Sequence, residues 1–232
     1  MSELLRCVNL TKKYANVTAL DGVNLTVESG KIIGLLGPNG SGKTTLIKLA
    51  NDLLKPTMGE IFVCGEKPGV LSKSRVAYLP DNNFLNNWMT IEQIVNYFCD
   101  FYSDFRRDLA YSMLEKLGIN PSVKLKTLSK GNKEKVSLIL VMSRNASLYI
   151  LDEPIAGVDP ATRDYIISTI INNYNPESSV IISTHLISDI EQVLDEVIFI
   201  NRGHVVLQKS VDEIREENGM SVDALFREVF KW

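Results

Sequence analysis

A glycine-rich segment follows a short apolar run, and its residue types suit the binding of phosphate groups. It matches the pattern G-x-x-x-x-G-K-[ST]. Glycines let successive backbone N–H groups surround phosphate oxygens where a side chain would clash. The lysine supplies charge to the β- and γ-phosphates, and the threonine hydroxyl can bind Mg²⁺. The segment therefore predicts a nucleoside triphosphate site. Its residues are Gly37, Pro38, Asn39, Gly40, Ser41, Gly42, Lys43 and Thr44.

Two acids end a second apolar run, which covers residues 148–151. Asp152 suits the coordination of Mg²⁺, directly or through water, and Glu153 is placed to accept a proton from an attacking water. A positioned base is typically worth ~10² to 10⁴ in rate. Near the phosphate-binding segment, these acids predict hydrolysis of the nucleotide.

A third segment, Leu-Ser-Lys-Gly-Asn at 128–132, precedes an apolar periodic stretch that begins at Val136. With Ser129 as its N-cap, it would form another helix N-terminus suited to an anion. A chain with one phosphate-binding segment has no obvious use for a second anion site, unless that site serves a nucleotide held by another subunit.

Together these segments resemble the ATP-binding cassette family, the ATPase domains of ABC transporters. Residues 128–132 are similar to the family's LSGGQ signature motif, and the resemblance runs from about Leu4 to Leu207. Four further motifs occur in the family's order. They are Tyr14 as the adenine-stacking aromatic, Asp81 at the Q-loop position, Gly157-Val158-Asp159 as the D-loop, and Ser183-Thr184-His185 with the switch histidine.

The resemblance implies a head-to-tail dimer that encloses two ATP molecules, homomeric or with a related subunit. Each ATP would lie on residues 37–45 of one subunit and meet Ser129 and Gly131 of the other. The implied roles sort into three sets. Glu153, His185 and Lys43 would be catalytic; Tyr14, Gly37 to Thr45, Ser129, Gly131 and Asp159 would bind ATP; Thr44, Asp81 and Asp152 would hold Mg²⁺.

Two positions depart from the family pattern. Asp81 replaces the Q-loop glutamine, and an ionised aspartate accepts hydrogen bonds but donates none. Lys130 and Asn132 replace the usual glycine and glutamine of the signature. Lys130 either adds charge near the nucleotide or is solvated, and the solvated position is favoured. The resemblance further implies a separate membrane permease, with export favoured over import.

Short strands and a buried run are predicted at the start of the chain. Apolar and polar residues alternate up to residue 28, with turn signals at Asp21-Gly22 and Ser29-Gly30, which predicts an antiparallel layer. The continuous apolar run 32–36 predicts a strand covered on both faces. A helix is predicted over 44–54.

The middle of the chain is predicted to be helical, over about 90–102 and 106–117. Thr90 and Gln93 have the spacing of a capping box at the start of the first of these helices. Residues 83–145 are therefore expected to form a helical subdomain. Residues 1–82 and 146–232 would form the α/β core, a P-loop NTPase core with a mainly parallel sheet, all within one domain. Further core elements are expected as strands at 148–151 and 180–183, a helix from Pro160, a hairpin over 197–207, and two short helices between 211 and 232.

Composition limits the function classes. The 232 residues are 45% hydrophobic and 23% charged, with a net charge of −3, which argues against a nucleic-acid partner. The start lacks secretory-signal features and no apolar run is long enough to span a bilayer, so a cytoplasmic protein at the inner face of the membrane is expected. Three widely spaced cysteines predict neither disulfides nor zinc.

Competing interpretations stay open at this point. One is a soluble cassette ATPase that acts on DNA or ribosomes, and another is a regulatory module with slow turnover. A phosphotransferase is disfavoured because Ser129 and His185 would then have no role. The apolar residues Phe84, Leu85, Trp88 and Met89 either pack locally or line the groove where family members receive a helix of the permease.

Overall fold

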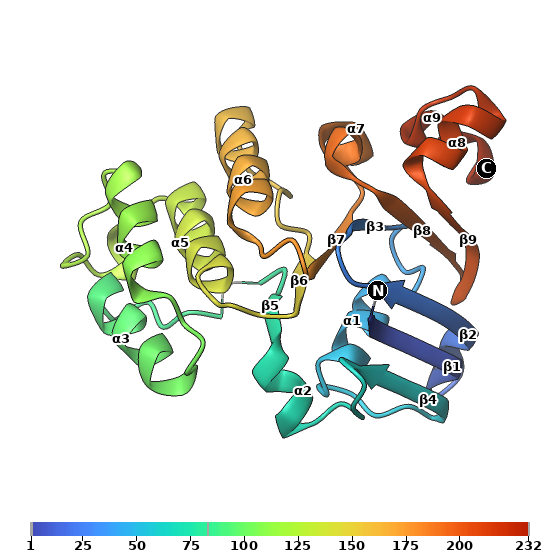
Figure 1. Ribbon diagram of the computed structural model, residues 1–232, viewed down its shortest axis with the longest axis horizontal. Coiled ribbons are helices and arrows are strands. Elements are labelled where there is room, and N and C mark those ends of the chain that lie inside the picture. Colours follow the sequence, from blue (N-terminus) through green and yellow to red (C-terminus); the bar gives the residue numbers. More distant parts are fainter. Residues whose placement is uncertain (1, 83, 232) are drawn as a thin grey trace.

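The computed structural model describes residues 2–82 and 84–231. The expected domain ends at 1 and 232 and the expected subdomain start at 83 lie outside this part. The described strands form one sheet of three strands and one of six. In Figure 1 the small sheet lies at one end of the molecule, and α3 (Ile91–Phe101), α4 (Arg107–Lys116) and α5 (Lys130–Met142) lie at the other.

The small sheet is antiparallel, as predicted, and contains β1 (Glu3–Tyr14), β2 (Val17–Glu28) and β4 (Met58–Val63) in the order β2-β1-β4. The prediction that Asp21-Gly22 is a turn between strands is wrong. Gly22 has φ +59° and lies inside β2, where Val23 pairs with Leu10 and Leu20 with Lys12. The extra residue on β2 makes a β-bulge, a second use for glycine in this conformation.

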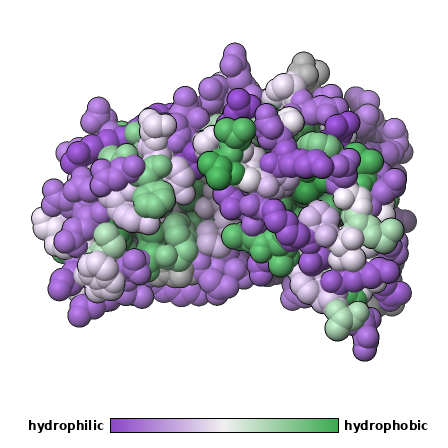
Figure 2. All heavy atoms as spheres, turned by 90° about the horizontal axis from the view of Figure 1, so that it is seen from below, coloured by the Kyte–Doolittle hydropathy of each residue, from purple (hydrophilic) through white to green (hydrophobic). Residues whose placement is uncertain are grey.

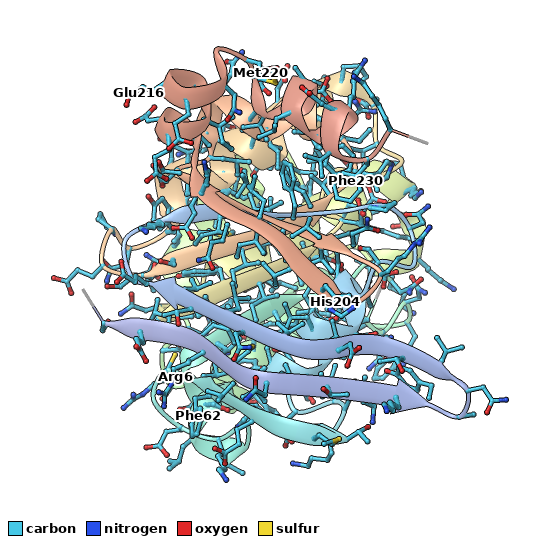
Figure 3. The ribbon with its side chains drawn as sticks, turned by 90° about the vertical axis from the view of Figure 1, so that its right-hand side faces the viewer. Arg6, Phe62, His204, Glu216, Met220 and Phe230 are labelled. Atoms are coloured by element: carbon cyan, nitrogen blue, oxygen red, sulfur yellow. The ribbon has the colours of Figure 1, made fainter. Side chains whose placement is uncertain are left out.

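On neighbouring strands of this sheet, Arg6 and Phe62 are register partners, with the Arg6 guanidinium carbon 4.8 Å from the ring centroid. Figure 3 shows both residues below β1 and β2 in that view. A cation–π contact at an exposed site is worth about 0.5–1 kcal/mol, so it adds modestly to the pairing of β1 with β4.

The larger sheet has the order β5-β6-β7-β3-β8-β9. Its first five strands run parallel, and β9 pairs antiparallel with β8 in the predicted hairpin. The α/β fold with a mainly parallel sheet is confirmed. The strands are β5 (Val76–Leu79), β6 (Leu148–Asp152), β7 (Ser179–Thr184), β3 (Ile32–Leu36), β8 (Glu196–Asn201) and β9 (His204–Ser210).

Two apolar layers cover this sheet. On one face α1 (Lys43–Ala50) packs between it and the small sheet; on the other lie α5, α6 (Pro160–Asn173), α7 (Ile187–Ile190), α8 (Val211–Asn218) and α9 (Val222–Val229). The helix predicted to reach residue 54 ends at Ala50, because Asn51 caps it and Asp52 has φ +56°. A short helix, α2 (Val70–Arg75), and the strands β4 and β5 were not predicted.

A third apolar cluster lies among α3 (Ile91–Phe101), α4 (Arg107–Lys116) and α5 (Lys130–Met142), and a 3₁₀ turn at Leu125–Thr127 lies between α4 and α5. The predicted capping box is present. The Gln93 amide N–H donates to Thr90 Oγ1 at 3.2 Å and the Thr90 amide to Gln93 Oε1 at 2.9 Å. None of the helices in the described residues has the length and apolar character to cross a membrane.

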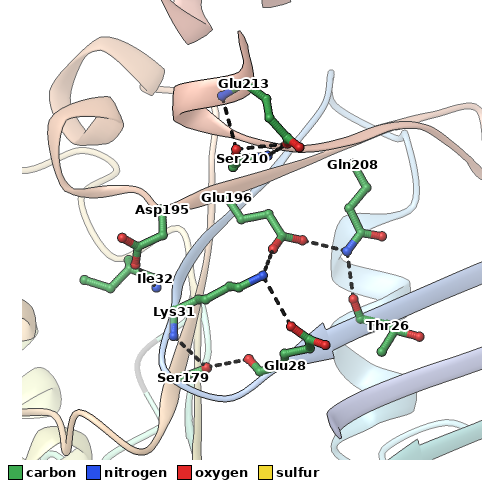
Figure 4. A network of polar contacts seen from close by, with 10 residues as sticks. All are labelled: Thr26, Glu28, Lys31, Ile32, Ser179, Asp195, Glu196, Gln208, Ser210 and Glu213. Atoms are coloured by element: carbon green, nitrogen blue, oxygen red, sulfur yellow. Dashed lines mark hydrogen bonds and ion pairs between the residues drawn. The ribbon is translucent and has the colours of Figure 1, made fainter. Parts of the chain in front are cut away.

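A polar network ties the two sheets together at the edge opposite the phosphate-binding segment (Figure 4). Lys31 Nζ lies 2.6 Å from Glu196 Oε2, and Gln208 Nε2 donates to Glu196 Oε1 at 2.6 Å. The same nitrogen donates to the Thr26 carbonyl on β2 at 2.7 Å. Because Glu196 is buried and both of its oxygens have partners, the network fixes how β2 lies against β8 and β9.

Candidate functional site

The phosphate-binding segment connects β3 to α1, and its glycines are required by neighbouring backbone. A Cβ on Gly37 would lie 2.2 Å from the Ile200 carbonyl oxygen, and one on Gly42 would lie 2.6 Å from the Ala19 carbonyl oxygen. Gly42 also has φ +118°, which L residues rarely adopt. The tight turn is thus held by β2 and β8 before any ligand arrives.

Lys43 begins α1 and is 7% exposed. Its Nζ donates to the carbonyl oxygens of Gly37 at 2.6 Å and Pro38 at 3.3 Å. Burial lowers the pKa of this ammonium group, while the charges of Glu153 and Asp152 raise it in part. The lysine is therefore held across the loop, facing the two acids, where it can exchange carbonyl oxygens for phosphate oxygens.

Asp152 ends β6 and is 1% exposed. It pairs in register with Ser183 on β7, and the Ser183 hydroxyl donates to Asp152 Oδ1. Burial raises the pKa of Asp152, opposed by this hydrogen bond. Its Oδ2 is buried without a hydrogen-bond partner in the described residues, which is costly for a carboxylate and typical of a ligand position.

Glu153 follows directly and adopts φ +52°, an uncommon backbone conformation for a non-glycine residue. Its amide donates to the Ser183 carbonyl oxygen at 3.0 Å. Its Oε2 lies 3.0 Å from Nδ1 of His185, the residue after β7. The positive φ turns the chain so that the two consecutive acids both lie at the carboxyl end of the sheet, as the sequence predicted.

Asp152, Glu153 and His185 open onto one cleft of about 500 Å³. Among the described residues, its lining includes Asn39, Asp81, Asp152, Glu153 and His185 from the predicted set. Asp81 is exposed, accepts a hydrogen bond from Asn82 Nδ2 at 2.8 Å, and its charge helps raise the pKa of Asp152. The structure thus brings Asp81 to the same cleft as Asp152 and Glu153.

The signature segment lies at the start of α5, where Ser129 is the N-cap and accepts from the Asn132 amide at 3.3 Å. Asp159 caps α6 in the same way. The Thr162 hydroxyl donates to Asp159 Oδ2 at 2.8 Å, and this hydrogen bond lowers the pKa of Asp159. A Cβ on Gly131 would lie 3.8 Å from Asp159 Oδ2. Two helix starts therefore lie side by side.

Lys130 has features of both positions expected for it. It is largely exposed, yet it lines the cleft, and a Cβ on Gly157 would lie 3.0 Å from its Nζ. Nζ also lies 3.8 Å from Glu134 Oε1, on the same helix. Lys130 thus adds positive charge beside the loop that follows Glu153.

Tyr14 is separate from the cleft lining. It ends β1, is 42% exposed, and pairs with Val17 on β2. Two residues beyond Val17, the Ala19 carbonyl faces Gly42. The Lys12 ammonium lies 5.3 Å from the centre of the Tyr14 ring. The hairpin of β1 and β2 therefore carries the Tyr14 ring close in sequence to Ala19, the residue that contacts the phosphate-binding segment.

The described residues contain no group of three or more His, Cys, Asp or Glu side chains arranged to hold a metal ion. Asp152 Oδ2 is nevertheless a buried carboxylate oxygen to which the described residues give no hydrogen bond within 3.5 Å, and the nearby Thr44 hydroxyl lowers the pKa of Asp152. Mg²⁺ is commonly bound by one or two carboxylates together with phosphate oxygens. These donors fit Mg²⁺ carried by a nucleotide.

Ser183 and Glu134 contribute to the site without having been predicted as site residues from the sequence. Ser183 fixes both acids, and its only sequence signal was its place two residues before His185 on a buried strand. Glu134 lines the cleft beside Lys130; burial raises its pKa, and its Oε2 is buried without a hydrogen-bond partner in the described residues. No motif marked Glu134, because its position depends on the path of α5.

Comparison with known proteins gives one consistent family. Residues 20–156 match the family model described as ABC transporter. The SkfA peptide export ATP-binding protein SkfE of Bacillus subtilis is 29% identical over 221 residues, 93% of this chain and 92% of that protein. The ABC transporter ATP-binding protein YtrB of the same organism is 30% identical, over 90% of this chain and 72% of that protein.

A solved structure of an ATP-binding subunit of an ABC transporter is also similar. It superposes with a TM-score of 0.88 at 27% identity, covering 98% of this chain and 100% of that one. The likeness therefore spans both sheets and the helices between β5 and β6.

Proposed function

Because the chain belongs to the ABC transporter family, as an ATP-binding subunit with ATPase activity, we propose that two subunits enclose two ATP molecules head to tail and drive a separate permease. The observation that carries this proposal is the convergence of Lys43, Asp152, Glu153 and His185 on one edge of the sheet. These groups supply phosphate binding, a metal ligand and a base. The site needs an additional anion-binding group for the γ-phosphate.

The signature segment is that group, supplied by the other subunit. Ser129 and Gly131 begin a helix beside Asp159 and lie outside the described lining of the cleft in their own chain. A helix N-terminus with a serine cap offers backbone N–H groups to an anion. Across a head-to-tail interface, Ser129 and Gly131 would bind the γ-phosphate and Asp159 would lie beside it, so closure depends on ATP.

In the proposed mechanism, residues 37–45 and Lys43 bind the phosphates, and Tyr14 stacks on adenine. Glu153 accepts the proton of the attacking water. His185 Nδ1 faces the Glu153 carboxylate, so Nδ1 carries the proton, and this hydrogen bond orients the base. Hydrolysis removes the γ-phosphate that joins the subunits, and the dimer opens.

Thr44, Asp152 and Asp81 would hold Mg²⁺. Bound there, the ion would neutralise charge on the β- and γ-phosphate oxygens. Asp152 would bind through Oδ2, since Ser183 occupies Oδ1.

The permease partner is assigned to the apolar side chains that packing leaves exposed. Leu85 is buried and Met89 packs against the helical cluster, whereas Phe84 and Trp88 are 42% and 65% exposed. Figure 2 shows apolar side chains gathered at the helical end and near the middle of one face. We assign Phe84 and Trp88 to permease contact, which would place the subunit at the inner face of the membrane.

Export is the proposed direction, supported by the peptide-export name of the SkfE relative. The proposed extent is a single cassette domain over 1–232, with the helical subdomain at 83–145. The third apolar cluster, drawn from residues 85–140, supports this division.

The test is phosphate release from ATP by the purified chain as a function of its own concentration, with Glu153→Gln as the control. Composite sites predict that activity per subunit rises with concentration and reaches a plateau. The control should bind ATP but lose at least ~10²-fold in turnover, because it lacks the base.

Activity per subunit that is constant over a wide dilution range would contradict sites shared between two subunits. ATP binding without turnover in the wild type, restored by a co-expressed related subunit or permease, would indicate a heteromeric dimer. Turnover that stays absent in both cases would favour the regulatory alternative.

A further inference from the structure

The signature segment and the acids Asp152 and Glu153 are connected through a buried junction between α5 and β6, which we call the vertex. Helix α5 begins at Ser129, runs away from the cleft and ends at Met142. Strand β6 then returns to the cleft and ends at Asp152. Between them lies Arg144, which is 3% exposed. The angle between α5 and β6 therefore sets the distance from the signature segment to the catalytic acids of the same chain.

The Arg144 side chain has hydrogen-bond partners in three segments. Its Nε and Nη2 donate to the Asp104 carboxylate at 3.0 to 3.2 Å. Its Nη1 donates to the Val76 carbonyl and its Nη2 to the Ser74 carbonyl, both at 2.7 Å. The guanidinium carbon lies 3.9 Å from the centre of the Tyr102 ring. One side chain thus joins the loop between α3 and α4 to β5.

Arg106 holds the backbone on the other side of the vertex. Its Nη2 donates to the carbonyl oxygens of Met142 at 2.7 Å, Arg144 at 3.1 Å and Asn173 at 3.0 Å. The Tyr149 hydroxyl on β6 also donates to the Arg144 carbonyl at 2.7 Å. The end of α5, the end of α6 and β6 are therefore fixed to one another. We call Asp104, Arg106 and Arg144 the arginine clamp.

We propose that the arginine clamp positions the signature segment by fixing the angle between α5 and β6. The role of that segment rests on the proposed head-to-tail dimer. Arg144 is a positioning residue: it lies at the far end of α5 from the nucleotide. Lysine cannot replace it, because an ammonium lacks the planar fork that reaches Asp104, Val76 and Ser74 together.

Because α5 is long, a small rotation at the clamp displaces Ser129 by a large distance. Thirteen residues of helix span ~20 Å at 1.5 Å per residue. A rotation of about 5° at the vertex would then move Ser129 by nearly ~2 Å. Misplacement by ~1 Å of a group that holds a reacting substrate can cost ~10²-fold in rate.

The first experiment measures the angle without nucleotide or dimer. Cysteines introduced at the exposed positions Lys48, on α1, and Lys126, just before α5, carry spin labels in the full chain. Pulsed electron paramagnetic resonance then measures the distance between the two labels, and so between the core and α5. Cys64 and Cys99 are replaced by serine. Cys7 stays, since it is buried and burial raises the pKa of its thiol to about 12, which keeps it unlabelled.

The matched control is Arg227→Lys, at an exposed arginine on α9 whose Nη2 lies 2.7 Å from Asp223. The proposal expects a narrow distance distribution in the parent chain and in this control. Arg144→Lys and Asp104→Asn should each broaden or shift it by about 2 Å, as the lever length implies. Unchanged distributions in both clamp variants, with folded protein, would overturn the proposal.

The second experiment separates binding from turnover. Arg144→Lys should keep the ATP Kd of the dilute subunit within about two-fold, since residues 37–45 are untouched, while kcat at saturating subunit falls by ~10²-fold. Parallel changes in Kd, kcat and Tm would mean that Arg144 only stabilises the fold. If wild-type activity does not depend on concentration, the proposed dimer fails, but the distance measurement still decides the role of the clamp.

Discussion

Ser183 fixes Asp152 and Glu153 at once from the neighbouring strand. Its hydroxyl donates to Asp152 Oδ1, and its carbonyl oxygen accepts from the Glu153 amide at 3.0 Å. The residue is fully buried on β7. Two acids that are consecutive in sequence, the proposed metal ligand and the proposed base, are therefore both held by one serine.

The first prediction concerns this serine. Ser183→Ala keeps the bond from the Glu153 amide to the Ser183 carbonyl oxygen. It removes the hydroxyl, which donates to Asp152 Oδ1 and also accepts from the Glu153 amide at 3.2 Å. Hydrogen bonds to charged groups are worth about 1.5–3 kcal/mol, so kcat should fall about 10- to 100-fold. Because this bond lowers the Asp152 pKa, its loss raises that pKa further, and the acid limb of the pH–rate profile should move to higher pH.

The control for that measurement is Ser168→Ala, the same chemical change on the exposed side of α6, where the hydroxyl donates to the Tyr165 carbonyl oxygen. Steady-state phosphate release between pH 5.5 and 9 compares the two variants. An acid limb that stays in place in Ser183→Ala would show that Asp152 does not govern it.

The second prediction concerns stability. Burial raises the Asp152 pKa above its ordinary value of 3.8, so the folded state binds the proton more tightly than the unfolded state. Stability from this group is present below the unfolded pKa and is lost as pH rises through the folded one. At neutral pH the carboxylate therefore destabilises the ligand-free fold.

Asp152→Asn removes that cost, because an unpartnered amide is cheaper to bury than an unpartnered charge and can still accept from Ser183. The gain should be about 1–3 kcal/mol, at roughly 2–4 °C in Tm for each kcal/mol. Thermal unfolding with a chelator should show the gain at pH 8 and a smaller one at pH 5, while hydrolysis is lost. A variant less stable at both pH values would contradict this account.

The sequence predicted the elements whose pattern is local. The run 32–36, the capping box at Thr90 and the proline that starts α6 each depend on neighbouring residues, and each is where it was expected. Strand β4 was missed because its first three residues are exposed and its pairing partner β1 lies far back in the chain. The Asp21-Gly22 turn was wrong for a related reason: glycine at a bulge and glycine at a turn look alike in sequence.

The candidate site was predictable where a motif names the residue. Asp81, Asp152, Glu153 and His185 do meet at one cleft, because the carboxyl ends of parallel strands lie at one edge. Glu134 was not predictable, since it reaches the cleft only through the path of α5. The roles given to Tyr14, Ser129, Gly131 and Asp159 stay predictions, because they require the nucleotide or the second subunit.

The third prediction concerns Tyr14. Base–aromatic stacking is worth about 1–3 kcal/mol, so Tyr14→Ala should raise the KM for ATP about 5- to 100-fold with little change in kcat. Tyr14→Phe keeps the ring, and the stacking account predicts an ordinary KM. Titrations with ATP and with inorganic triphosphate separate the contributions. If Tyr14→Ala weakens triphosphate as much as ATP, the ring does not contact the base.

The last prediction concerns Asp81, which replaces the glutamine of the family motif. Asp81 lines the cleft and its charge raises the pKa of Asp152. Asp81→Gln supplies a donor for the attacking water, so kcat at saturating Mg²⁺ should rise a few-fold, as expected for one added hydrogen bond of about 1 kcal/mol. The same change replaces a carboxylate ligand by an amide, so the Mg²⁺ concentration for half-maximal rate should also rise.

Asp81→Asn, one methylene shorter, is the matched control and should raise the Mg²⁺ requirement without the gain in kcat. Phosphate release across a Mg²⁺ titration measures both quantities. If Asp81→Gln leaves both unchanged, Asp81 is neither a metal ligand nor a neighbour of the attacking water.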